Sequence, residues 1–178
     1  MKIRNAMGII VMEGLGKKIS ITTKTGNVII DSLTASAFSF VRITGKLTAG
    51  RLDARDITLV STSGSNHVKV LAARTLTVTC KSGSVSIGDC GADETSVTTS
   101  SGSVDLSFGE FSARRLVAQT ESGSVAVKLP RVGGFAISAK SSTGRITSDF
   151  PVLTEIASGQ KASVAISTKT GSVNIKTR

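Results

Sequence analysis

Apolar and polar residues alternate along most of the chain, and short turns that each hold one glycine interrupt the alternation. The turns read TG or SG, as in TGN at Thr25 and SGS at Ser82. Alternation with a period of two predicts strands that bury one face. Each unit of the pattern therefore contains two strands joined at a glycine turn. The turn glycines are Gly26, Gly45, Gly64, Gly83, Gly102, Gly123, Gly144 and Gly171.

The turn glycines recur at a nearly constant interval. Four intervals of 19 residues are followed by two of 21 and one of 27. In the N-terminal half, a third apolar segment of the form L-x-A, such as Leu33 and Ala35, completes each unit. A unit of this size cannot bury its apolar face alone, whereas stacked units can. The pattern predicts an all-β fold, a single-stranded parallel β-solenoid (β-helix) of about eight coils with a 19-residue repeat. An antiparallel sandwich is the alternative, although it requires no constant period.

We expect a single β-solenoid domain over residues 1–178, with the repeats in 19–178. Residues 1–16 are expected to form a partial coil that caps the rod. In the phase of the repeat, Met7 stands where a glycine would.

At four positions that are predicted to face the interior of the rod, the side chain differs from those at the equivalent positions of the other repeats. Asn66 replaces a valine, and Arg42 replaces a serine or threonine. Because a buried unpaired polar group costs about 1–3 kcal/mol, we expect a bulge near Asn66. We expect Arg42 to place its head group outside the core or to have a partner. Cys80 and Cys90 are predicted to be buried free thiols, with a disulfide within one coil as the alternative.

The stretches SGSVSI, SGSVDL, SGSVAV and TGSVNI, each preceded by an alternating strand, resemble the adhesin family of β-solenoid domains, whose function is unknown. The resemblance covers residues 19–178. It implies a β-solenoid and, through the family name, an extracytoplasmic adhesin-like surface module. It supplies no catalytic residues.

Residues that could carry catalysis or bind a metal are few. The chain has one histidine, His67, no CxxC motif and 12 scattered carboxylates, which form no nucleophile–base pair and no metal cluster. We therefore expect a protein that is not an enzyme and that needs no cofactor and no metal. No small-molecule substrate is evident.

Basic residues give the chain a formal net charge of +10, so its surface attracts anions. The repeat places Arg55 and Arg74 in one row, and aromatic residues are too scarce for base stacking. Contact with the RNA backbone or another anionic surface is one interpretation. A solubilising surface, in which Asp93 pairs with neighbouring arginines, is the other. The candidate contacts are Arg55, Arg74, Arg114, Arg115, Lys69 and Lys128.

The longest interval between turns contains the segment SDFPVLTEIASGQ, from Ser148 to Gln160. Added residues must leave the stack as loops, and loops on rigid scaffolds often carry binding. We expect this loop and an unpaired edge at Val173–Ile175 to dock a second copy end to end or a neighbouring subunit. A flap over the final coils is an equal alternative. The apolar residues of the loop are Phe150, Val152, Leu153 and Ile156.

The sequence thus predicts a non-catalytic structural scaffold, a rigid basic rod that is a subunit of a larger assembly. An RNA-containing organellar assembly, such as a mitochondrial ribosome, is one host that fits the charge. The alternative function is the adhesin-like surface module. We expect an intracellular protein, and an extracytoplasmic one if a leader has been removed.

Overall fold

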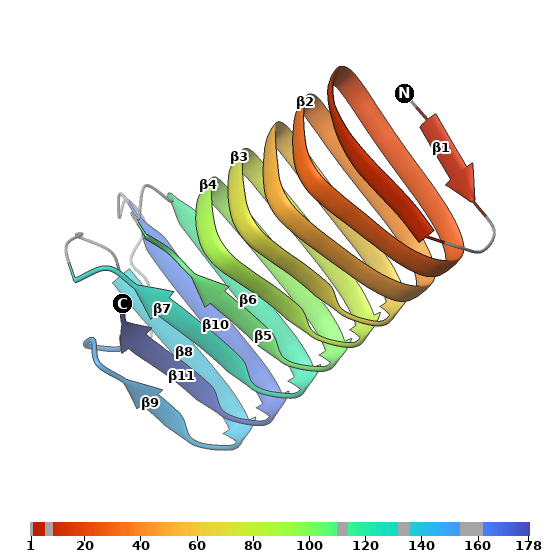
Figure 1. Cartoon of the computed structure of the whole chain (residues 1–178). Coiled ribbons are helices and arrows are strands. Elements are labelled where there is room, and N and C mark those ends of the chain that lie inside the picture. The colour runs from red at the N-terminus through yellow and green to blue at the C-terminus, as the bar shows by residue number, and fades with distance from the viewer. Residues whose placement is uncertain (1, 6–8, 110–113, 132–135, 154–161) are drawn as a thin grey trace.

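The computed structural model describes residues 2–5, 9–109, 114–131, 136–153 and 162–178, without the side chains of 5 and 9–15. These residues form one sheet of 11 strands in which all strand pairs are parallel, and they contain no helix. The sheet winds into the rod of Figure 1, so the predicted all-β solenoid is confirmed.

Several strands run through more than one wall of a coil, because the chain bends at the corners without leaving the sheet. Strand β2, the longest, covers almost three turns of the rod (Figure 1). The strands are β1 (Lys2–Asn5), β2 (Ile9–Ser63), β3 (Asn66–Ser82), β4 (Val85–Ser101), β5 (Val104–Ser107), β6 (Arg115–Ser122), β7 (Val125–Leu129), β8 (Ala136–Thr143), β9 (Ile146–Ser148), β10 (Ser163–Thr170) and β11 (Val173–Thr177).

The turn glycines share one corner of the rod, as the repeat predicts. All eight have a positive φ, between 108° and 155°, which other residues adopt only with strain. A Cβ atom on Gly83 would also overlap the carbonyl oxygen of Gly64 in the preceding coil. The backbones of stacked coils therefore approach so closely at this corner that only glycine fits.

The order of the last two coils differs from their order in the chain. Strand β10 lies between β6 and β8, and β11 lies between β7 and β9. Val173 pairs with Val125 on one side and with Ile146 on the other. The expectation of an unpaired edge at Val173–Ile175 is therefore wrong. The coil made of β8 and β9 forms the end of the rod (Figure 1).

The inward side chains give a physical reason for this order. Ile175 and Ser148 occupy equivalent positions in the two coils, because they are partners in the β11–β9 register. Ile175 is fully buried inside the rod, whereas Ser148 is half-buried at its end. Burying an isoleucine stabilises by about 1.5–3 kcal/mol, whereas burying an unpaired hydroxyl costs free energy. The more apolar coil therefore lies inside.

The core is a continuous apolar column formed by the inward rows. The leucines that open the third segments stack on one another in the N-terminal coils and end at Cys90, which is 1% exposed. Further along the rod, Phe108 and Leu129 are fully buried. Each of them follows its turn glycine by six residues, whereas the stacked leucines follow theirs by seven.

The N-terminal strand β1 adds to the first coil, with Lys2 paired to Ser20 and Arg4 to Thr22. Paired residues of β1 and the first coil are therefore 18 positions apart in the chain. The repeat predicts 19 positions, the separation between Met7 and Gly26, so the observed register is shifted by one residue. Met7 itself lies outside the described residues.

Residues after β9 fold back against the end of the rod. Phe150 packs against the core, and the Leu153 amide donates a hydrogen bond to the Ile137 carbonyl at 2.7 Å. Val152 and Leu153 remain 38% and 43% exposed. The first part of the candidate loop, Phe150–Leu153, therefore forms a flap over the end of the rod. Ile156 lies outside the described residues.

Candidate interaction surfaces

The predicted arginine row follows one corner of the rod, away from the glycine corner. Arg55 and Arg74 lie in adjacent coils, since the flanking residues Ala54 and Ala73 are register partners. The next two coils contribute Asp93 and Arg114, joined by a backbone hydrogen bond from the Arg114 amide to the Asp93 carbonyl at 2.7 Å. All three arginines are exposed. The row is therefore interrupted by one carboxylate and is not uniformly positive.

These arginines form no direct ion pair with the carboxylates described beside them. Asp93 forms no ion pair with Arg74 or Arg114, and the exposed Arg115 forms none with its register partner Glu94. The ion pairs among described residues lie elsewhere, at Arg51–Asp53, Lys169–Glu121 and Arg178–Asp89.

The predicted lysine row is only partly contiguous. Lys128 on β7 is the register partner of Lys176 on β11, so two exposed ammonium groups lie in adjacent coils. Lys69 stands in the same row three coils away, beyond Gly88 and Ser107. The structure thus brings together the pair Lys128 and Lys176, and it separates Lys69 from them.

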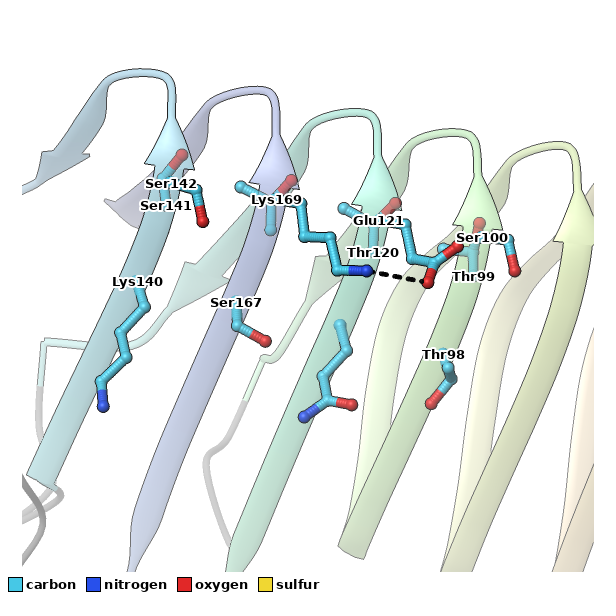
Figure 2. Close-up of a pocket in the computed structure, with 12 residues that line it drawn as sticks. Thr98, Thr99, Ser100, Thr120, Glu121, Lys140, Ser141, Ser142, Ser167 and Lys169 are labelled. Carbon is cyan, nitrogen blue, oxygen red and sulfur yellow. Dashed lines mark hydrogen bonds and ion pairs between the residues drawn. The ribbon is translucent and has the colours of Figure 1, made fainter.

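A shallow polar groove of about 480 Å³ crosses the outer face of β4, β6, β10 and β8 (Figure 2). Serine and threonine hydroxyls line it, together with Gln119 and Lys140. The Lys169 ammonium is 3.3 Å from the Glu121 carboxylate across the groove. The sequence could not reveal this groove, because it depends on β10 lying between β6 and β8.

Hydroxyls three residues before the turn glycines have a structural role. The Thr120, Thr168 and Ser141 hydroxyls each donate a hydrogen bond of 3.0–3.3 Å to a glycine carbonyl of the adjacent coil. They satisfy acceptors at the tight corner. Cys80 occupies the same row, and its thiol is 3.8 Å from the Gly64 carbonyl oxygen.

Arg42 and Asn66 meet inside this corner. Arg42 is 2% exposed, and its Nη2 donates hydrogen bonds to the Asn66 Oδ1 at 3.1 Å and to the Ser65 carbonyl at 2.9 Å. Asn66 keeps the regular register between Leu47 and Val85. The predicted bulge is therefore wrong, and so is the external head group. The alternative expectation, a partner for Arg42, is confirmed.

The same hydrogen bonds continue to Cys80. Asn66 Nδ2 donates to the Ser61 hydroxyl at 3.2 Å, and the Ser61 hydroxyl donates to Cys80 Sγ at 3.1 Å. Burial lowers the pKa of Arg42 from its ordinary value, and the nearby Cys80 has the opposite, smaller effect. Nε and Nη1 of Arg42 have no hydrogen-bond partner. This buried cation is therefore stabilised by neutral acceptors and by the Phe40 ring, whose centroid is 5.6 Å away.

Both cysteines are buried free thiols, as predicted. Burial raises the pKa of Cys90 to about 11, so this thiol stays protonated and weakly nucleophilic at neutral pH.

The described residues show no group of three or more His, Cys, Asp or Glu side chains that could hold a metal ion. They also contain no helix long and apolar enough to cross a membrane. The surfaces are exposed cations, hydroxyls and strand edges, and these groups suit the binding of other molecules.

Fold and surfaces together define a parallel β-solenoid repeat domain. The chain belongs to the family described as Toastrack DUF4097, whose model matches residues 3–178. This family is a domain of unknown function, so the match does not establish the adhesin role that the resemblance implied. No match was found among curated proteins or solved structures.

Proposed function

We propose that the chain is a non-catalytic scaffold, a rigid basic rod that binds partners within a larger assembly. The observation that carries this proposal is the set of exposed arginines along one corner that form no ion pair with any residue the structure describes. A rod whose coils are joined by parallel strands holds such groups at fixed intervals of about 4.8 Å. A repetitive anion such as the phosphate backbone of RNA is the partner that such a row suits.

The proposal extends to an intracellular, RNA-containing host assembly, with an organellar ribosome as one example. Contact would be made to phosphates rather than bases, since the chain has only six phenylalanines and no tryptophan or tyrosine. Recognition would therefore depend little on RNA sequence and strongly on salt.

Neutralising the arginine corner should weaken RNA binding and its salt dependence together. We expect the fourfold variant Arg55→Gln, Arg74→Gln, Arg114→Gln and Arg115→Gln to reduce the slope of log K against log salt by about 3 for single-stranded RNA. The matched control removes the same charge at the glycine corner, through Lys24→Gln, Lys46→Gln, Lys81→Gln and Arg145→Gln. Fluorescence anisotropy between 50 and about 200 mM salt measures both.

Equal slopes in the two variants would contradict the assignment to the arginine corner.

Affinity purification of the native protein at low and high salt tests whether the chain is part of a larger RNA-containing assembly. Recovery of RNA and a defined set of subunits at low salt supports the scaffold, whereas recovery of the chain alone at both salts contradicts it.

A further inference from the structure

The end of the rod at β8 and β9 differs from every other coil in its backbone hydrogen bonds. In each interior turn, the glycine amide and the amide two residues later donate to carbonyls of the next coil. Gly171 N donates to the Thr143 carbonyl at 3.0 Å, and Val173 N donates to the Arg145 carbonyl at 2.9 Å. Within the part of the chain that the structure describes, Gly144 N and Ile146 N have no such acceptor. The end therefore presents two N–H donors of an unpaired parallel edge.

The side chains of this end are also incompletely covered. Ile146 is 39% exposed, whereas its register partner Val173 is fully buried. The flap at Phe150–Leu153 covers the start of β8, where the Leu153 amide bonds to the Ile137 carbonyl, and it leaves the glycine turn open. A strand added beyond β9 would bury Ile146 and accept the two hydrogen bonds.

Charges beside the edge favour an anionic partner. Lys140 on β8 and Arg145 in the turn are exposed and form no ion pair with a described side chain. The nearby Asp149 carboxylate already accepts hydrogen bonds from the amide and hydroxyl of Thr177, at 3.0 Å and 3.3 Å. Among the described residues named here, two cations stand beside one carboxylate, so the edge carries a net positive charge.

A second copy of the chain is a poor occupant. Arg4 pairs with Thr22 of the first coil, four residues before its glycine, and Lys140 holds the corresponding position in the end coil. An in-register, head-to-tail copy would place Arg4 directly opposite Lys140, and like charges in directly opposite positions are destabilising.

From these observations we infer that the β8–β9 end is a docking site for an extended acidic segment of a partner protein, which adds to the sheet as a further parallel coil. The partner's carbonyls accept from Gly144 N and Ile146 N, its apolar residue covers Ile146, and its carboxylates lie opposite Lys140 and Arg145. Strand addition of this kind takes affinity from main-chain hydrogen bonds and specificity from side chains. This site is separate from the arginine corner, so either proposal can fail without the other.

The chain supplies a probe in its own repeat. A synthetic peptide of residues 98–107, which spans the turn of Gly102 and stops short of the place where Leu153 bridges Ser138 on β8, carries Thr98 and Ser103 at the positions that would face Lys140 and Arg145. We compare one peptide with Thr98→Glu and Ser103→Asp and one with lysine at both positions. Titration calorimetry with the full chain at low salt should show roughly tenfold tighter binding of the acidic peptide.

Charge reversal on the protein locates the site. The variant Lys140→Glu/Arg145→Glu should reverse the preference between the two peptides, whereas Lys2→Glu/Arg4→Glu at the opposite end should leave it unchanged. The first variant should also begin to associate end to end, because Arg4 would then face a carboxylate. An unchanged preference in the first variant, or end-to-end association of the wild-type chain at the same concentration, would overturn the inference.

Discussion

Gly83→Ala should destabilise the rod by about 4 kcal/mol or more. The substitution forces a left-handed residue to carry a Cβ atom, at φ 132°, which costs about 1–2 kcal/mol by itself. The same Cβ overlaps the Gly64 carbonyl oxygen, a backbone atom that cannot move without separating two coils. Losses above about 4 kcal/mol are exceptional for single substitutions and mark a specific clash of this kind.

Gly91→Ala is the matched control. Its backbone does not need a positive φ, and its Cβ would meet the Leu71 carbonyl oxygen at an ordinary 3.5 Å. We expect a change within about 0.5 kcal/mol, as for surface substitutions without special contacts. Thermal unfolding followed by circular dichroism should separate the two variants by about 8–16 °C. Similar melting temperatures would show that the glycine corner does not hold the coils together.

The second large effect is expected from Arg42 and Asn66, which should be strongly coupled. Among the described residues, Asn66→Val removes the one side-chain acceptor of a buried guanidinium, and leaving a buried charged donor unpaired costs about 3 kcal/mol. Arg42→Met, which nearly preserves the side-chain volume, leaves the Asn66 Oδ1 without a donor and costs about 1–3 kcal/mol. The double variant has two apolar side chains at this corner and leaves neither a buried cation nor an unpaired Asn66 amide. Because apolar replacement of buried charged groups is often neutral or stabilising, we expect it to match or exceed the wild type.

Urea unfolding of the four proteins gives the coupling free energy directly. A value of about 2 kcal/mol or more is expected. Additive losses in the double variant would mean that Arg42 is held by the Ser65 carbonyl and the Phe40 ring and does not depend on Asn66.

The 19-residue period made the architecture predictable, because inward rows and glycine corners repeat together. The contact between Arg42 and Asn66 was only partly predictable. Each residue alone suggested a disturbance of the stack. However, one precedes its glycine by three residues and the other follows the next glycine by two, so both lie at one corner in adjacent coils. That shared position was the signal of a pair.

The order of the last coils could not be read from the turn spacing, because any two coils can form the same backbone hydrogen bonds. Ser148 was the available clue, since a polar residue in an inward row fits the end of the rod better than its interior. The polar groove and the docking edge depend on this order, and so the sequence did not reveal them.

Engineered disulfides can distinguish the observed order of the last two coils from stacking in chain order. In the observed order Lys128 lies beside Lys176, about 4.8 Å away between α-carbons, which suits a disulfide. Asp149 lies two coils from Lys128, about 9.6 Å away, which is beyond disulfide reach. Stacking in chain order would instead place Asp149 directly beside Lys128.

The measurement is oxidation of Lys128→Cys/Lys176→Cys and Lys128→Cys/Asp149→Cys, followed by mass mapping of the disulfides. Cys80 and Cys90 remain as buried internal controls. We expect rapid disulfide formation in the first variant and none in the second. A disulfide between positions 128 and 149, with none between 128 and 176, would contradict the observed order.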